Sequence, residues 1–245
     1  MIERYSLPEM AAVWSEEHRL AVWQEIEALV VEAWAAEGVV PASAAAAVRA
    51  APEVDREAWR AREAETGHDL AAFVDILAAS AGAGGEWVHF GLTSSDVLDT
   101  ALGVLLGDAG YLLLGRLAAL FDVLRRRALE HRSTMMVGRT HGMWAEPTTF
   151  GLKLAGWAFE AQRNHERLSR AAAGAAVGKV SGAVGTYAHV PPAVEAFVCE
   201  RLGLGVEPAS TQVVARDRYA EFLSALALTG AMLERIAVEI GRAHV

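Results

Sequence analysis

The sequence predicts an all-α protein in which a small N-terminal helical domain is followed by a long-helix bundle. Apolar residues recur at three- and four-residue steps through most of the 245 residues, which is the spacing of one face of a helix. Glycine and proline stand where these stretches begin or end. The helices before Leu92 are short and those after it are long, so we expect domains over 1–92 and 93–245.

Three short helices are expected in the N-terminal domain. The first lies between Ser15, which can cap its N-terminus, and Gly38, which can end it. An alanine-rich helix over 42–50 follows between two prolines, and a third helix over 62–80 runs into a cluster of glycines. The stretch 87–95 is expected to be non-helical.

Long helices alternate with loops in the second domain. The pattern predicts helices over 96–131, 147–173 and 191–202, and a last one from 214 onward. Pro147 is assigned to the first helical position, where proline is favoured. The stretch 137–146 is expected to be non-helical, and 174–190 a loop or a short hairpin. Three glycines between 103 and 110 are interpreted as sites of close packing, because each weakens helicity by about 1 kcal/mol relative to alanine.

Composition limits the classes of protein to which the chain can belong. With 53% hydrophobic and 22% charged residues, it is too apolar for a disordered chain. No uncharged stretch reaches the roughly 18 residues that cross a bilayer, and the N-terminus lacks the basic and apolar regions of a signal peptide. A single cysteine, Cys199, excludes an internal disulfide and a cysteine-built zinc site. We therefore expect a cytoplasmic protein with no membrane partner.

Charge and motif content exclude further classes. A net charge of -9 argues against a nucleic-acid partner, which requires a basic face, but local arginines and helix N-termini can still bind an anionic small molecule. No metal or dinucleotide site is predicted, because the histidines show no ligand spacing and no phosphate-binding glycine motif occurs. A Ser–His–Asp hydrolase is not excluded by residue type, although no GxSxG elbow is present.

Three polar clusters lie at helix ends or in loops. In the first, Gly67-His68-Asp69, His68 falls opposite the apolar face of the helix predicted over 62–80, so by itself it is more often a solvated surface histidine than a catalytic one. The second, Thr93-Ser94-Ser95-Asp96, precedes a long helix. A serine cap is the favoured interpretation there, and binding of a carboxylate by the hydroxyls and free N–H groups is the alternative.

The third cluster is Gly138-Arg139-Thr140-His141-Gly142. Glycines on both sides allow a sharp turn and a close approach to a ligand. A histidine at an exposed tip can transfer protons near neutral pH. An ordinary loop with a chance histidine is the alternative, because so short a motif is weak alone.

Several longer motifs follow one another along the chain. They occupy residues 1–6, 87–97, 138–142, 145–153, 178–187, 210–212 and 216–218. Each is modest alone, but in this order and spacing the chain resembles the adenylosuccinate lyases, a family of the fumarase/aspartase superfamily, over essentially all 245 residues.

This resemblance implies an all-α homotetramer with shared active sites and no metal or organic cofactor. Adenylosuccinate lyases serve purine and AMP biosynthesis. They release fumarate by β-elimination from adenylosuccinate, giving AMP, and from the succinylated aminoimidazole carboxamide ribotide. A base removes a weakly acidic proton beside a carboxylate, nearby donors stabilise the carbanion-like species, and an acid protonates the departing nitrogen. The resemblance makes His141 the general acid and gives His68 a supporting role beside the succinyl group or His141.

The resemblance also implies a set of substrate contacts. They fall on Arg4, Tyr5, Gly67, His68, Asp69, Thr93, Ser94, Thr140, Lys179 and Gln212. Arg4 is expected near the nucleotide phosphate, and Thr140 and Lys179 are the weakest assignments. Gly67 stands where relatives often have a basic or polar residue, and Trp144 where they often have a second histidine. Both departures bear on fine substrate contacts.

The family's general base is a serine in a glycine- and serine-rich loop that should follow the last predicted helix. These 245 residues do not include it, so the resemblance implies that 93–245 is only the first part of a long-helix bundle, incomplete at its C-terminus. We expect them, on their own, to be inactive or nearly so, and to associate through an uncovered apolar stripe. The alternatives are another fumarate-releasing lyase of the argininosuccinate type, a cycloisomerase, or a non-catalytic helical assembly module.

Overall fold

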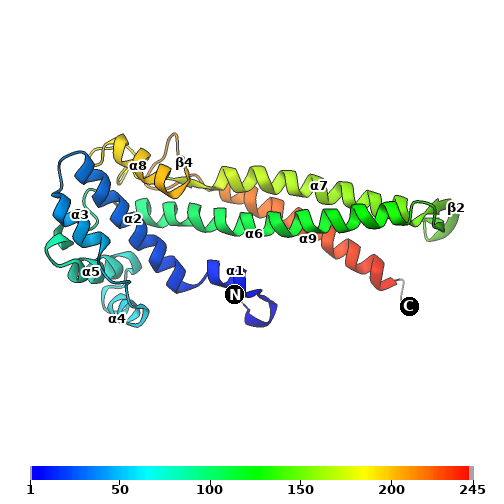
Figure 1. Ribbon diagram of the computed structural model, residues 1–245, viewed down its shortest axis with the longest axis horizontal. Coiled ribbons are helices and arrows are strands. Elements are labelled where there is room, and N and C mark those ends of the chain that lie inside the picture. The colour runs from blue at the N-terminus through cyan, green and yellow to red at the C-terminus, as the bar shows by residue number, and fades with distance from the viewer. Residues whose placement is uncertain (1, 243–245) are drawn as a thin grey trace. The chain divides into compact units, whose positions relative to one another are not determined.

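The structure, a computed structural model, describes residues 2–242 and is mostly helical, as predicted (Figure 1). The residues form two compact units. The first combines the chain up to Ala109 with Ala175–Arg216, and the second combines Gly110–Gly174 with the chain from Asp217 onward. The chain first passes between the units inside a long helix. A domain boundary near residue 92 coincides with none of these crossings and stays a prediction.

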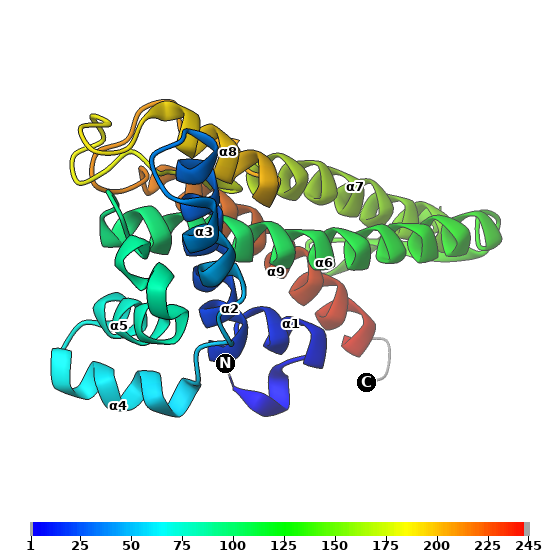
Figure 2. The same cartoon turned by 60° about the vertical axis from the view of Figure 1, so that its left-hand side comes forward.

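The first unit is built around one buried helix. Its helices are α1 (Pro8–Val13), α2 (Glu16–Ala36), α3 (Ala42–Arg49), α4 (Arg56–Thr66), α5 (Asp69–Ala81), α8 (Pro192–Leu202) and the start of α6 (Ser94–Glu130), with 3₁₀ turns at Glu3–Tyr5 and Gly82–Trp87 (Figures 1 and 2). Trp23, Ile26 and Val30 of α2 are buried at the centre of the core. Trp23 meets the rings of Trp59 in α4 and Phe73 in α5 edge-on, with centroids 6.2 and 5.5 Å away.

The ends of these helices follow the expected signals, with one correction. Ser15 caps α2 through its side chain, and Gly38 follows the helix with a φ of 75°. The single helix predicted over 62–80 is wrong, because α4 and α5 meet within it. Gly67 ends α4 with a left-handed φ of 63°, and His68 then caps α5. His68 therefore lies at a junction between two helices and not on a helix face.

The stretch 174–190, expected to be a loop or a short hairpin, is mostly a loop and forms no hairpin. Strand β3 (Val177–Gly178) pairs in parallel with β4 (Gly205–Val206), which comes after α8. Gly103 lets β3 lie directly against α6, since a Cβ there would sit 2.3 Å from the Val177 carbonyl oxygen. The close-packing interpretation of this glycine is confirmed.

Within the residues that the structure describes, the second unit contains three helical segments and one hairpin. These are the rest of α6, α7 (Phe150–Ala175), α9 (Asp217–Arg242), and the antiparallel strands β1 (Met135–Thr140) and β2 (Met143–Thr149) (Figure 1). Helix α6 approaches α7 closely at Gly110, where a Cβ would lie 2.7 Å from that of Ala172. Lys153 of α7 and Glu239 of α9 form an ion pair.

Two predicted helix starts are wrong. Pro147 lies in β2, opposite Val137, and α7 begins at Phe150. Proline is tolerated there because each strand of a two-stranded ribbon keeps one unpaired edge. Helix α9 begins at Asp217 and not at 214, because the N–H of Val214 donates to a side chain of α6 instead of entering a helix.

Helix α6 meets the length and composition test for a membrane span. Of its most apolar 18-residue window, 28% is buried inside the protein. The sequence-based expectation that no membrane span is present was therefore too strict. One helix of this kind is weak evidence, because the core helix of a soluble protein passes the same test.

Candidate functional site

Two of the three predicted polar clusters come together in the first unit. The Nε2 of His68 lies 3.4 Å from the Ser94 hydroxyl, and its Nδ1 lies 3.5 Å from Asp69 Oδ1. Because Nδ1 also accepts the N–H of Ala71, the neutral ring is assigned its proton on Nε2, which then donates to Ser94. The side chain of His68 is 48% exposed, so this group is open to a ligand.

The cap at the start of α6 is made by Asp96. Its Oδ2 accepts the N–H of Thr93 at 2.8 Å, the contact in which the third helical residue reaches back to the capping residue. The favoured interpretation of a cap by Ser94 or Ser95 gives way to this arrangement. The hydroxyl of Ser94 faces His68 instead.

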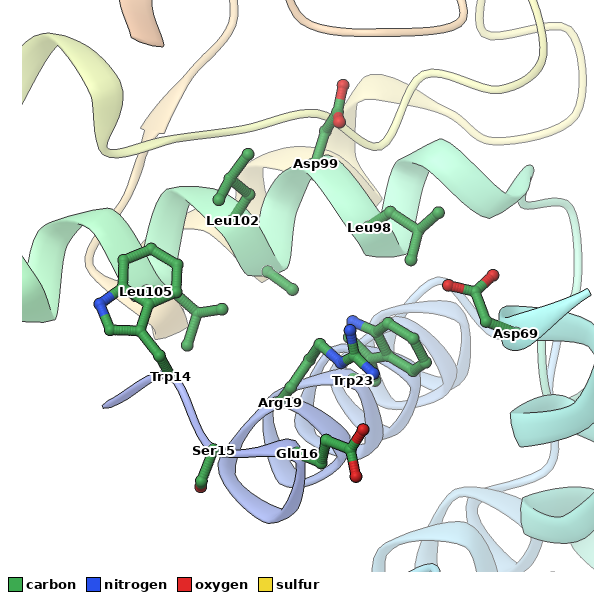
Figure 3. A pocket seen from close by; sticks show the side chains of 11 residues that line it. Trp14, Ser15, Glu16, Arg19, Trp23, Asp69, Leu98, Asp99, Leu102 and Leu105 are labelled. Carbon is green, nitrogen blue, oxygen red and sulfur yellow. The ribbon is translucent and has the colours of Figure 1, made fainter. Parts of the chain in front are cut away.

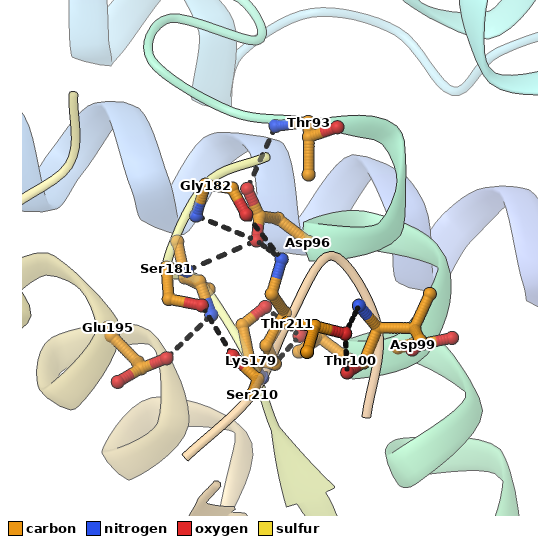
Figure 4. A network of polar contacts seen from close by, with 12 residues as sticks. Thr93, Asp96, Asp99, Thr100, Lys179, Ser181, Gly182, Glu195, Ser210 and Thr211 are labelled. Carbon is orange, nitrogen blue, oxygen red and sulfur yellow. Dashed lines mark hydrogen bonds and ion pairs between the residues drawn. The ribbon is translucent and has the colours of Figure 1, made fainter. Parts of the chain in front are cut away.

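Lys179 is completely buried, and so is the carboxylate that it meets. Its Nζ donates to Asp96 Oδ1 at 2.6 Å and to the Gly182 carbonyl oxygen at 2.8 Å (Figure 4). The resemblance gives Lys179 a substrate contact, which stays a prediction. In this geometry the ammonium of Lys179 binds Asp96 and the Gly182 carbonyl oxygen.

The remaining predicted substrate contacts of the first unit are exposed. Gln212 lies in a loop whose Ser210 hydroxyl is 2.8 Å from that of Ser181 (Figure 4). Arg4 and Tyr5 form part of a 3₁₀ turn, with the guanidinium 4.7 Å from the ring centroid. Within residues 2–242, no hydrogen bond or ion pair is found that joins Arg4, Tyr5 or Gln212 to His68.

An open pocket of about 370 Å³ lies beside Asp69 (Figure 3). Trp14 and leucines of α6 form its apolar side. Arg19 lies over the rings of Trp23 and Trp59, 5.1 and 5.2 Å from their centroids. The pocket therefore combines an aromatic wall, a cation and the carboxylate of Asp69.

The third cluster forms the tip of the hairpin in the second unit. Thr140 pairs with Met143, and the two residues between them, His141 and Gly142, have φ values of 53° and 74°. Positive φ at both central residues is typical of a type I′ turn. His141 is exposed at this tip, as expected. His68 and His141 thus belong to different units.

One candidate that sequence reasoning missed is His89. It has a left-handed φ of 63°, and its N–H and Nδ1 meet the fully buried carboxylate of Glu27 at 2.8 and 2.7 Å. Burial opposes the charged imidazolium, but the hydrogen bond and charge of Glu27 outweigh it and raise the pKa of His89. The available signal was Glu27, a charged residue within the apolar part of α2.

Known proteins resemble the chain in both sequence and fold. A family model described as "Lyase" matches residues 3–242. Adenylosuccinate lyases of Bacillus subtilis and of Synechocystis sp. are each 50% identical over 240 residues, which are 98% of this chain and 56% of either relative. The chain thus spans little more than half the length of these relatives.

Solved structures give the same picture. A fumarate lyase from Mesorhizobium sp. BNC1 has a TM-score of 0.90 at 32% identity, over 96% of this chain and 57% of its own. A 3-carboxy-cis,cis-muconate lactonizing enzyme from Pseudomonas putida has a TM-score of 0.89 at 32% identity, over 96% and 55%. Because the family model matches nearly the whole chain and the fold agrees, the chain belongs to this lyase family, within the fumarase/aspartase superfamily.

Proposed function

We propose that the chain functions in an adenylosuccinate lyase, which releases fumarate by β-elimination from adenylosuccinate and from the succinylated aminoimidazole carboxamide ribotide. The observation that carries the proposal is the half-exposed group of His68, Asp69 and Ser94. It occurs in a chain that is 50% identical to adenylosuccinate lyases. Both histidines needed by the proposed chemistry are present, at a helix junction and at a hairpin tip.

The proposed roles follow from the chemistry of each group. His141 protonates the departing nitrogen, since an exposed imidazole can donate a proton near neutral pH. Ser94 and the N-terminus of α6 bind a succinyl carboxylate, because a hydroxyl and a helix dipole favour negative charge there. His68 orients that carboxylate through its contact with Ser94.

Further roles complete the proposed substrate site. Arg4 and Tyr5 bind the nucleotide, with the Arg4 guanidinium at the phosphate. Thr93 and Gln212 bind neighbouring polar groups. No metal or organic cofactor takes part in the proposed reaction.

The proposed partners are a nucleotide substrate and further copies of the chain in a cytoplasmic homotetramer, with neither nucleic acid nor membrane. Exposed apolar residues support self-association. In the second unit, Leu152, Phe159 and Leu223 are each more than 60% exposed. Sedimentation of the purified protein tests this, and a monomer at micromolar concentration contradicts it.

A second candidate is a cycloisomerase or another fumarate-releasing lyase. The observation in its favour is the fold, since muconate-lactonizing and cycloisomerase structures reach TM-scores of 0.89 at 32% and 27% identity. A non-catalytic assembly module is the third candidate. The higher identity to adenylosuccinate lyases makes the first proposal the preferred one.

The test is a chimaera in which the aligned residues of this chain replace those of the Bacillus subtilis relative. We expect it to release fumarate from adenylosuccinate and not from argininosuccinate. His141→Ala should lower the rate by about 10²–10⁴-fold, the usual contribution of one acid–base group. His165→Ala on α7 is the matched control. A folded chimaera that acts on a muconate or on argininosuccinate, but not on adenylosuccinate, contradicts the proposal.

A further inference from the structure

One face at the start of α6 carries three buried polar side chains. They belong to Asp96, Asp99 and Thr100, at helical positions i, i+3 and i+4, and none of these residues is more than 5% exposed as a whole. Buried polar groups of this kind need partners inside the protein. In this case the partners come from two loops far along the chain (Figure 4).

The first loop is fixed by Asp96 and Thr100. Asp96 Oδ1 accepts the ammonium of Lys179 at 2.6 Å and the N–H groups of Ser181 and Gly182 at 3.1 and 3.2 Å. The Thr100 hydroxyl donates to the Lys179 carbonyl at 2.9 Å and accepts its N–H at 3.0 Å. Residues 179–182 are therefore held to α6 through both main chain and side chain.

The second loop is fixed by Asp99. Its Oδ2 accepts the N–H of Val214 at 2.7 Å and the guanidinium of Arg216 at 2.9 Å. The two loops are joined directly, because the hydroxyls of Ser181 and Ser210 lie 2.8 Å apart. One helical face thus sets the register of both loops.

The energetics of a buried ion pair favour a positioning role over a stabilising one. Removing a carboxylate and an ammonium from water is costly, and well-packed apolar side chains in their place would often be as stable. What such a pair supplies is a unique arrangement, since a displaced loop would leave a buried charge and two N–H groups without partners. The segments arranged here lead directly to Thr93-Ser94 and to Gln212.

We propose that Asp96 and Asp99 are positioning residues, which hold the loops 179–182 and 210–216 in register so that Ser94 and Gln212 are presented together to a substrate carboxylate. The binding of a substrate carboxylate by Ser94 and Gln212 rests on the proposed function. The coupling of the two loops does not.

Amide hydrogen exchange of the 245-residue protein tests the coupling. In Asp96→Asn we expect exchange to accelerate at least tenfold in 179–182 and also in 210–214, and by more in these loops than in α2 and α5 of the same unit. Asp108→Asn, on the same helix with a half-exposed side chain, is the matched control and should change neither loop. Acceleration confined to 179–182 overturns the coupling.

Ser181→Ala keeps the inference testable if Asp96→Asn does not fold. This variant removes the link between the loops and leaves every buried charge paired. We expect tenfold faster exchange in 210–212 and no change in the Ser181 and Gly182 amides, which Asp96 still accepts. Unchanged exchange in 210–212 overturns the inference.

The presentation of Ser94 and Gln212 to a substrate carboxylate is tested separately, in the chimaera with the Bacillus subtilis relative. Ser181→Ala should raise KM for adenylosuccinate about tenfold and leave kcat within about twofold, since it displaces a binding loop and no reacting group. An unchanged KM overturns the positioning role. An inactive chimaera contradicts the proposed function, and hydrogen exchange then still decides whether the loops are coupled.

Discussion

Replacing Gly103 with alanine should destabilise the first unit, whereas the same change one helical turn later should not. A Cβ at Gly103 would lie 2.3 Å from the Val177 carbonyl oxygen, and real Cβ atoms essentially never approach closer than 3.0 Å. The carbonyl must therefore retreat by at least 0.7 Å, the difference of these two distances. It cannot do so freely, because β3 is paired with β4 and the next carbonyl accepts the N–H of Glu207 at 3.0 Å.

Gly107 is the matched control for this change. It lies in the same helix and unit, and its Cβ would make an ordinary contact at 3.7 Å with Ala176. Both variants gain about 1 kcal/mol of helix propensity, so the difference between them isolates the overpacking cost of about 1–3 kcal/mol. Gly107→Ala should be neutral or stabilising, and Gly103→Ala destabilising.

Urea unfolding followed by tryptophan fluorescence measures the difference, since Trp23 and Trp59 lie in the core of the first unit. Equal unfolding free energies for the two variants, within about 0.5 kcal/mol, would refute the reasoning. They would mean that β3 can move away from α6 at little cost.

Three further predictions concern buried groups. Lys179→Met should lower the unfolding free energy, measured in urea, by about 3–5 kcal/mol. The double variant with Asp96→Asn should lose less than the sum of the two single losses, and full additivity contradicts the pairing. The pKa of His89 is raised in the folded protein by its contact with Glu27. This contact therefore stabilises the folded state fully below the unfolded pKa of about 6.5, and the stabilisation is lost as pH rises through the higher folded pKa. Stability from pH 6 to 8 should therefore fall more steeply in the parent than in His89→Gln, and parallel pH profiles contradict this. Burial raises the pKa of Cys199 to about 12, so a thiol reagent at pH 8 should modify it only after unfolding, and rapid modification of the native protein contradicts this.

The fold class was predictable from local pattern, but some helix ends were not. Ser15 and Gly38 gave correct limits for α2 because a cap and a left-handed glycine act within a few residues. Pro147 was misplaced because proline suits both a first helical turn and the edge of a ribbon, and only pairing with Val137 decides between them. The break at Gly67 was missed because residues 62–69 have no apolar side chain apart from that of Ala64, so no apolar face marked where one helix ends and the next begins.

The candidate site was partly predictable for a similar reason. His68, Ser94 and His141 stood out because each lies near a helix end or a glycine. The contacts between them could not be predicted, since the hydrogen bond from His68 to Ser94 joins residues 26 positions apart. The role of Asp96 was hidden for the same reason: its partner Lys179 is 83 residues away. Neither spacing nor propensity carries information over that distance.

The interrupted order of the first unit has a consequence for synthesis on the ribosome. Helix α2 packs against α8, and the start of α6 against residues 177–182 and 210–216, so the unit lacks part of its core until Arg216 has been made. At about 5–20 residues per second, the stretch from 110 to 216 takes roughly 5–20 s to translate. Through that interval the surface of α2 that packs against α8 lacks its partner, and so do the carboxylates of Asp96 and Asp99. The nascent chain should therefore bind chaperones strongly until residues 175–216, the second segment of the first unit, have been made and packed.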